Sequence, residues 1–450
     1  MKALRRALFI AVLALLVAAA GAVVARNRSD DSAGELGAKA TPTTSVTAPA
    51  GAGGVTSTTT VTGPTISVPP AQKKVFDELM AQVAGVRGLQ WKGPLNLRVV
   101  PAAELARLLK AADERDLKPE QLEQQSQALK LLHLIPASTD LRQTLEDLLS
   151  GVVLGFYDPK TKELVVGGDD LGPNTRYTIA HEMTHALTDQ WFNFGPATDA
   201  LDEAGKTEES AAYSALIEGD AVLTQELWAD KYLTPQEALA AALGGGAGDY
   251  SAVARTPAYI LQSLFFPYDE GRTFVGRLHE NGGFAAVDAA YRKPPTSTEQ
   301  IIQPETYLAG QPSASPALPD LAAATGCAPV TSGAVGMFDM RAVLSQRLSM
   351  SDARRAVDGW NGDAFRLVRC GTALGMADRW DTDSGADPGR LVDAVNRWAG
   401  TWTGAGKAPG ADGRFSGPNG AGRVLRTGSR VDLVLAENAA TADKLIAALG

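Results

Sequence analysis

Residues 173–190 read PNTRYTIAHEMTHALTDQ and contain the motif on which the interpretation of this chain depends. Within them, His181, Glu182 and His185 form the pattern H-E-x-x-H. On a helix, positions i and i+4 lie on the same face, so two imidazoles at this spacing can bind one Zn2+ ion. The glutamate beside the first histidine is then within reach of a water molecule on the metal. The pattern therefore predicts a zinc site in which Glu182 acts as a base.

The motif is predicted to lie on a buried helix. Proline, asparagine and threonine at residues 173–175 are typical of a helix start. Apolar or small side chains then recur in two stripes, which are Tyr177, Ala180, Thr184 and Leu187, and Ile179, Met183 and Ala186. A helix that is apolar on so much of its surface is buried. This pattern suits a metal-binding helix at the floor of a cleft.

A catalytic zinc needs a third protein ligand, and Glu218 is the candidate. The residues that follow His185 contain no histidine in a zinc-binding spacing, so we expect a carboxylate from another helix. The same face of that predicted helix carries only small side chains, which are Ala211, Ser214 and Ala215. The helix can therefore pack close to the motif helix. The alternative is that Glu218 is a surface carboxylate, which its apolar surroundings disfavour.

Three other carboxylates near Glu218 are expected to have different roles. Asp220 lies about 200° further round the helix, so it is not expected to bind the same ion directly. It is instead a candidate for orienting a ligand histidine. Glu208 and Glu209 are expected near the solvated start of the helix.

A β-hairpin is predicted just before the motif helix. Residues 152–157 form its first strand, residues 158–162 its turn and residues 163–166 its second strand. Such a hairpin offers an edge strand that can align an extended peptide by backbone pairing. A further strand is predicted over residues 95–100.

The first 26 residues are predicted to be a signal peptide or a membrane anchor. Lys2, Arg5 and Arg6 precede an uncharged run of apolar or small residues at 7–25. The run is just long enough to span a membrane, whereas its many alanines favour a cleaved signal, and both alternatives remain open. In either case the rest of the chain is expected outside the cytoplasm, membrane-anchored or secreted.

Residues 27–70 are rich in Ser, Thr, Ala, Gly and Pro, and this composition predicts a disordered linker. The two cysteines of the chain, Cys327 and Cys370, can form one disulfide in an exported protein. The alternative is a pair of unpaired buried thiols. The net charge of −9 gives no basic surface, so nucleic acid is not an expected partner.

Residues 151 to about 310 resemble the glutamate-ligand zincins, and within them a group of exported bacterial metallopeptidase-like proteins. The matching segments lie at residues 155–158, 181–190, 218–221, 266–268 and 294–300, with weaker likeness at 359–363 and 380–382. One position departs from the family pattern, which has a histidine before proline where this chain has Gln303. Any role of that histidine is therefore not carried over.

The chain is expected to have an α+β fold in two parts, of which the resemblance covers only the first, while the second is inferred from alternating helix-like and strand-like segments after residue 320. Residues 71–310 are expected to form a zincin-like metallopeptidase lobe, mostly helical with an edge β-hairpin. Residues 311–450 are expected to form a smaller C-terminal α+β lobe. The resemblance further implies that His181, His185 and Glu218 bind zinc.

In the same family the glutamate of the motif, here Glu182, is the general base in hydrolysis of a peptide or protein substrate. Two alternatives are a silent zincin-fold scaffold at the cell surface and a zinc amidase that acts on cell-wall links. The intact Glu182 argues against the silent scaffold. The residue that stabilises the oxyanion is left open among Tyr268, Tyr291, Tyr307 and His279.

Overall fold

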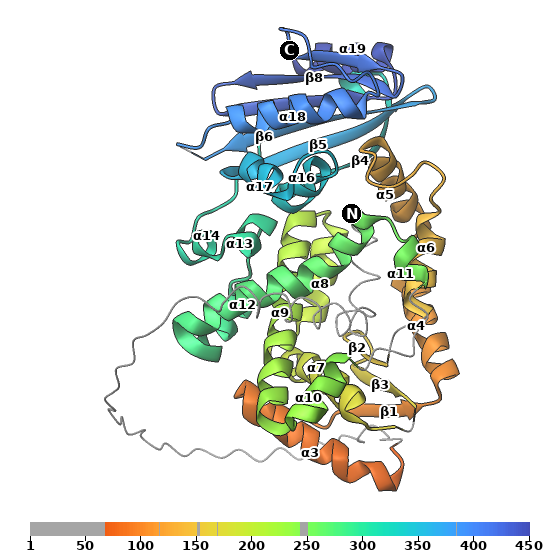
Figure 1. The fold of residues 1–450 in the computed structure, drawn as a ribbon, viewed down its shortest axis with the longest axis vertical. Helices are drawn as coiled ribbons and strands as arrows, with labels where there is room; N and C mark the ends of the chain where they lie inside the picture. Colours follow the sequence, from red (N-terminus) through yellow and green to blue (C-terminus); the bar gives the residue numbers. More distant parts are fainter. Residues whose placement is uncertain (1–67, 117, 151–153, 169, 244–250, 384) are drawn as a thin grey trace.

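The structure is a computed structural model and describes residues 68–450 except 117, 151–153, 169, 244–250 and 384. The predicted signal or anchor and nearly all of the predicted linker lie outside the described residues. The α+β fold is confirmed. A mostly helical N-terminal part with a small sheet is joined to a C-terminal part built on a larger antiparallel sheet (Figure 1).

The N-terminal part is a set of helices around a three-stranded sheet. Its helices are α3 (Pro70–Arg87), α4 (Ala102–Asp116), α5 (Pro119–Leu131), α6 (Leu141–Ser150), α7 (Pro173–Phe192), α8 (Phe194–Glu203), α9 (Thr207–Tyr232), α10 (Pro235–Leu243), α11 (Ser251–Arg255), α12 (Ala258–Arg292), α13 (Thr298–Ile302) and α14 (Pro304–Leu308). Its strands are β1 (Asn96–Val100), β2 (Gly155–Asp158) and β3 (Glu163–Gly167).

The small sheet has the order β1-β3-β2, so β2 is an edge strand beside the motif helix α7. The predicted hairpin is β2 and β3, which pair antiparallel with Phe156 opposite Val165. The predicted strand at residues 95–100 is β1, and it pairs parallel with β3. Alternation predicted the strand at residues 95–100 and the proline-containing turn predicted the hairpin, but the sheet order depends on contacts between distant segments.

Helices α9 and α12 are in close backbone contact where each carries a glycine. A Cβ atom on Gly219 would lie 2.1 Å from the carbonyl oxygen of Gly271, and one on Gly271 would lie 2.2 Å from that of Ala215. The small side chains of α9 thus allow a close helix contact, as expected. The partner at the shortest approach is α12, whereas the sequence predicted the motif helix.

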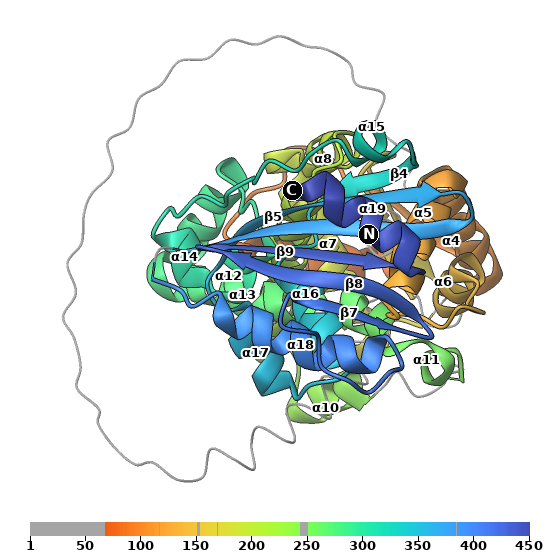
Figure 2. The same ribbon diagram turned by 90° about the horizontal axis from the view of Figure 1, so that it is seen from above.

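The C-terminal part is a six-stranded antiparallel sheet with helices on both faces (Figure 2). The strand order is β4-β5-β6-β9-β8-β7. The strands are β4 (Ala328–Gly333), β5 (Trp360–Cys370), β6 (Ala373–Thr382), β7 (Arg414–Gly417), β8 (Gly420–Thr427) and β9 (Arg430–Ala436). The helices are α15 (Leu321–Thr325), α16 (Gly336–Ser345), α17 (Met350–Val357), α18 (Gly389–Trp402) and α19 (Ala439–Leu449).

Alternation along the strands divides the core of this sheet into two layers. Leu433 and Leu435 belong to the core that α16, α17 and α18 cover, whereas Val434 belongs to the core under α15 and α19. Successive side chains of a strand point to opposite faces, so each long strand supplies both layers. The sheet is therefore buried on both sides.

The two parts of the molecule share one hydrophobic core. Side chains from α5, α6 and α12 join the layer under α16 and α18, and the indole of Trp402 donates a hydrogen bond to the carbonyl oxygen of Leu131 at 2.9 Å. A second junction forms at Glu208, whose Oε2 accepts hydrogen bonds from the amide and the hydroxyl of Thr298. That hydroxyl also accepts one from the amide of Phe338 in α16. The expectation of a solvated Glu208 is thus wrong, because its side chain joins α9, α13 and α16.

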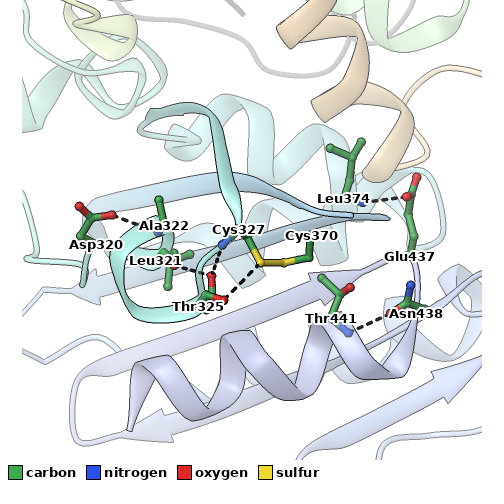
Figure 3. The surroundings of a disulfide bond; sticks show 10 residues. All are labelled: Asp320, Leu321, Ala322, Thr325, Cys327, Cys370, Leu374, Glu437, Asn438 and Thr441. Carbon is green, nitrogen blue, oxygen red and sulfur yellow. Dashed lines mark hydrogen bonds between the residues drawn. A yellow bond between two sulfur atoms is a disulfide. The ribbon is translucent and has the colours of Figure 1, made fainter. Parts of the chain in front are cut away.

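Cys327 and Cys370 form a disulfide, which confirms that prediction (Figure 3). It ties the segment before β4 to the end of β5, and the amide of Cys327 donates to the Thr325 hydroxyl beside it. None of the helices in the described part of the chain combines the length and the apolar character that a bilayer span requires.

Candidate metal centre

Helices α7 and α9 bring together the three side chains that the sequence predicts as metal ligands. Nε2 of His181 lies 3.0 Å from Nε2 of His185. Oε2 of Glu218 lies 3.1 Å from the first of these nitrogens and 3.3 Å from the second. The three atoms thus form a nearly equilateral triangle, and within the described residues this is the one group of three or more such side chains that could hold a metal ion.

The triangle has the dimensions that zinc requires. With bonds of about 2.0–2.1 Å and tetrahedral angles, two donor atoms on one zinc ion lie about 3.3 Å apart. The three observed separations are within a few tenths of an ångström of that value. The donor set of two imidazoles and one carboxylate leaves a fourth position open, as catalytic zinc sites do. The residues present therefore fit the ion.

The three side chains of the triangle are buried, and their polar atoms face one another. His181 is 1% exposed, His185 3% and Glu218 2%. The second carboxylate oxygen of Glu218 is buried and has no hydrogen-bond partner among the described residues. Burial opposes ionisation of Glu218, but His185 and His181 outweigh it and hold the pKa of this carboxyl at about 2. A buried carboxylate with a vacant oxygen is an arrangement that a bound cation stabilises.

Glu182, the predicted base, lies beside this triangle and contacts the edge strand. Its Oε2 accepts a hydrogen bond of 2.8 Å from the backbone amide of Tyr157 in β2. Burial raises the pKa of Glu182 to about 8, with smaller and opposing contributions from His185 and the Tyr157 amide. A carboxyl with such a pKa can exchange a proton near neutral pH.

The edge of β2 that does not pair with β3 is buried and faces the site. The carbonyl oxygens of Leu154 and Asp158 accept bonds from the β3 side, so the backbone groups of alternate residues point to β3. Those of Gly155 and Tyr157 consequently point away from β3, and the contact between Tyr157 and Glu182 agrees with this. An extended segment that pairs with this edge would lie next to Glu182.

Gln225, which the sequence analysis missed, holds the outer nitrogen of His181. Its Oε1 lies 3.3 Å from Nδ1 of His181, and its Nε2 donates to the carbonyl oxygen of Tyr177 at 2.8 Å. Gln225 lies on α9, two helical turns after Glu218, on the same side of that helix. That spacing was the only signal in the sequence that pointed to it.

Asp220 does not have the role considered for it. Its carboxylate accepts hydrogen bonds from Nε of Arg87 at 2.8 Å and from the hydroxyl of Tyr291 at 3.1 Å. Arg87 also binds Asp288 at 2.7 Å, and its side chain is fully buried. Asp220 thus belongs to a buried ion-pair network that ties α3 to α9 and α12, and it orients no ligand histidine.

Among the four candidate oxyanion donors, only Tyr268 lies against the metal ligands. Its ring stacks on that of His181 with centroids 6.0 Å apart. Burial, then the charges of Glu218 and Glu182, raise its pKa well above the ordinary value, so its hydroxyl stays protonated. The other three are occupied elsewhere: Tyr291 binds Asp220, Tyr307 donates to the carbonyl of Lys293, and His279 packs on Phe284.

Gln303, where the family pattern has a histidine, lies far along the chain from the ligands and takes part in the junction between the two parts of the molecule. Its Nε2 donates to Oδ1 of Asp358 at 3.2 Å, and its backbone follows α13. The departure from the family pattern therefore falls at the interface with the C-terminal part.

Comparison with known proteins assigns only the C-terminal sheet. Residues 327–446 match the model of a family described as a domain of unknown function, DUF8575. The search of curated proteins and the search of solved structures each returned no match. The matched segment begins at Cys327 of the disulfide and ends within α19, and it contains none of the residues of the candidate metal centre.

Proposed function

We propose that this protein is an exported zinc-dependent metallopeptidase. The observation that supports it most is the buried triangle of His181, His185 and Glu218 with the Glu182 carboxylate next to it. A silent scaffold has no physical need for an acidic side chain at that place, since a buried carboxylate costs free energy. The disulfide supports a location outside the cytoplasm, where such bonds persist.

His181, His185 and Glu218 would hold the zinc ion, which supplies Lewis acidity that acidifies a water molecule and polarises a carbonyl. Glu182 would accept a proton from the attacking water and pass it to the leaving nitrogen of the peptide bond. The hydroxyl of Tyr268 would donate a hydrogen bond to the developing oxyanion.

The edge of β2 that β3 leaves unpaired would align the substrate. Gly155 and Tyr157 present backbone groups that can pair with an extended peptide, and Tyr157 is the residue whose amide now contacts Glu182. Such pairing reads the backbone and not the side chains, so it suits peptide and protein substrates of varied sequence. This favours a peptidase over an amidase that acts on cell-wall links.

Substrate entry requires a change of conformation around the site. Glu182 is 7% exposed and the three ligand side chains are less exposed still, so a peptide cannot reach them in the described conformation. The chemistry is thus shielded from bulk water until a substrate displaces its surroundings.

A degradation assay tests the proposal. The full chain is incubated with unfolded casein or with peptidoglycan, with and without a chelator, and zinc is then added back. We expect casein fragments that disappear with the chelator and return with zinc. Release of peptidoglycan fragments alone would support the amidase, and bound zinc without cleavage of either substrate would support the scaffold.

A further inference from the structure

We propose that Gln225 is a positioning residue that selects the metal-binding tautomer of His181. This inference rests on the proposed zinc site and names a part of it that the H-E-x-x-H motif does not contain. Gln225 touches neither substrate nor metal in this scheme, because it acts only through the imidazole of His181.

The position of Gln225 is held from two sides. Gln225 is 2% exposed and His181 is 1% exposed, so water does not compete for their polar atoms. Gln225 Nε2 donates to the carbonyl oxygen of Tyr177 at 2.8 Å. Tyr177 lies one turn before His181 on α7, so Gln225 joins α9 to α7 at two neighbouring points.

The Tyr177 contact decides which way the amide of Gln225 faces. A carbonyl oxygen only accepts hydrogen bonds, so the amide nitrogen of Gln225 must face Tyr177. Its Oε1, which also only accepts, is then the atom 3.3 Å from Nδ1 of His181. The Gln225 contact therefore favours the tautomer that carries the proton on Nδ1. The reverse orientation of the amide would place its oxygen against the carbonyl oxygen of Tyr177, an acceptor against an acceptor.

The tautomer that follows is the one that can bind a metal in this site. A neutral imidazole protonated on Nδ1 has its lone pair on Nε2. Nε2 is the nitrogen that faces His185 and Glu218, at 3.0 Å and 3.1 Å. Gln225 thus keeps the His181 lone pair directed at the centre of the donor triangle. Without it, both tautomers of a buried imidazole would compete, and metal binding would have to select one.

The orienting group is an amide and not a carboxylate. An amide is neutral, so it carries no charge into the buried site. Glu218 already supplies one negative charge, and Asp220 lies on the same helix with its charge offset by Arg87. A neutral partner fixes the tautomer without the cost of a further buried anion.

Two variants of Gln225 test the proposal through metal affinity, measured by competition with a chromophoric chelator on the full chain. Gln225→Met keeps the length and bulk of the side chain but removes both polar atoms, and we expect the Kd for zinc to rise about 10–100-fold. Gln225→Glu keeps an acceptor towards Nδ1 but loses the donor towards Tyr177 and adds a buried anion, so we expect a Kd between those of wild type and Gln225→Met.

A matched control is Gln82→Met, since Gln82 accepts a hydrogen bond from the Trp228 indole of the same helix α9 but contacts no metal ligand. Thermal unfolding of the metal-free proteins separates loss of stability from loss of metal affinity. A purely structural role for Gln225 predicts that Gln225→Met and Gln82→Met are destabilised alike and bind zinc alike, and this result would overturn the proposal.

The tautomer of His181 can also be measured directly. The chain has four histidines, so the ring nitrogens in long-range 1H–15N spectra can be assigned by single substitutions. In the metal-free state we expect a larger share of His181 protonated on Nδ1 in wild type than in Gln225→Met, and an equal share in the two proteins would overturn the inference. If the wild type binds no zinc, the proposed function itself fails. If it binds zinc and Gln225→Met binds equally well, only the role of Gln225 fails.

Discussion

The backbone amide of Tyr157 donates a 2.8 Å hydrogen bond to the carboxylate of Glu182. The phenol of the same residue donates to Asp189 at 2.6 Å, two turns further along the motif helix. Tyr157 therefore fixes the edge strand β2 against α7 at two points. The edge of β2 that β3 leaves unpaired and the predicted base are thereby held side by side, although they come from separate elements.

Replacing Glu182 by glutamine tests the assignment of the base. Glutamine keeps an acceptor for the Tyr157 amide and should leave the three ligands in place, but it cannot take up a proton. We expect zinc content near wild type and a kcat on casein lowered at least about 10²–10⁴-fold. Glu120→Gln, at an exposed position, serves as the control. Substantial residual hydrolysis by Glu182→Gln would exclude the proposed mechanism.

Replacing Glu218 by alanine tests the third ligand. The triangle would lose its only anion, so we expect zinc affinity to fall by more than the about 10–100-fold typical of outer partners. Elemental analysis after dialysis measures the loss. Glu226→Ala on the same helix removes a part-exposed carboxylate that pairs with Arg272, and it should retain zinc. Full zinc occupancy in Glu218→Ala would show that the ligand assignment is wrong.

The hydroxyl of Tyr268 is expected to act in the transition state and not in binding the metal. Tyr268→Phe keeps the ring that stacks on His181, so zinc content should not change. We expect kcat to fall about 10²–10³-fold with little change in KM, since one oxyanion donor is removed. Tyr307→Phe, whose hydroxyl donates to Lys293, is the control. An unchanged kcat in Tyr268→Phe would exclude this role.

The glycine contact between α9 and α12 is expected to limit the stability of the site. A methyl group on Gly271 would lie 2.2 Å from the backbone oxygen of Ala215, so the two helices would have to separate. We expect Gly271→Ala to lower the free energy of unfolding by about 1–3 kcal/mol in urea. Gly276→Ala on the same helix meets only the flexible end of Arg272 and should be close to neutral. Equal stability of the two variants would contradict the packing argument.

A pair of buried carboxyls in the C-terminal sheet predicts a pH-dependent stability. Asp363 in β5 accepts hydrogen bonds from the amides of Val335 and Gly336, and Asp378 in β6 lies beside it. Burial raises the pKa of Asp363 to about 6, and burial and the charge of Asp363 raise that of Asp378 well above its ordinary value. Both pKa values are higher in the folded state than in the unfolded state.

Because both pKa values are raised on folding, the two carboxyls favour the folded state most when they are protonated. Their contribution to the free energy of unfolding is complete below about pH 4 and is lost as the pH rises through the folded pKa values. One such carboxyl contributes a slope of at most about 1.4 kcal/mol per pH unit. Between pH 5 and pH 8 we expect the free energy of unfolding of Asp378→Asn to rise relative to that of wild type by at least about 1 kcal/mol, measured by urea unfolding. Asp393→Asn, at an exposed position, should show no such gain. A pH-independent difference would rule out titration of Asp378 as the cause.

Much of the site and fold followed from local patterns. The motif helix and the strand at residues 95–100 each have a periodicity that a short window of sequence contains, and the hairpin has a proline-containing turn between two apolar segments. Glu218 was inferred from the chemistry of zinc, which demands a third ligand, together with the small side chains around it. The pairing of the two cysteines followed from their number and the expected export.

What only the tertiary structure decided are the contacts between segments far apart in the chain. Gln225 follows Glu218 by seven residues, a spacing that many pairs of residues on helices share. Only the packing of α9 against α7 places its side chain on His181. Tyr268 and Tyr291 look alike in sequence, yet one stacks on a ligand and the other binds Asp220. The short-range pattern of a chain determines which face of an element is buried, whereas the residue it meets there depends on how all the elements pack together.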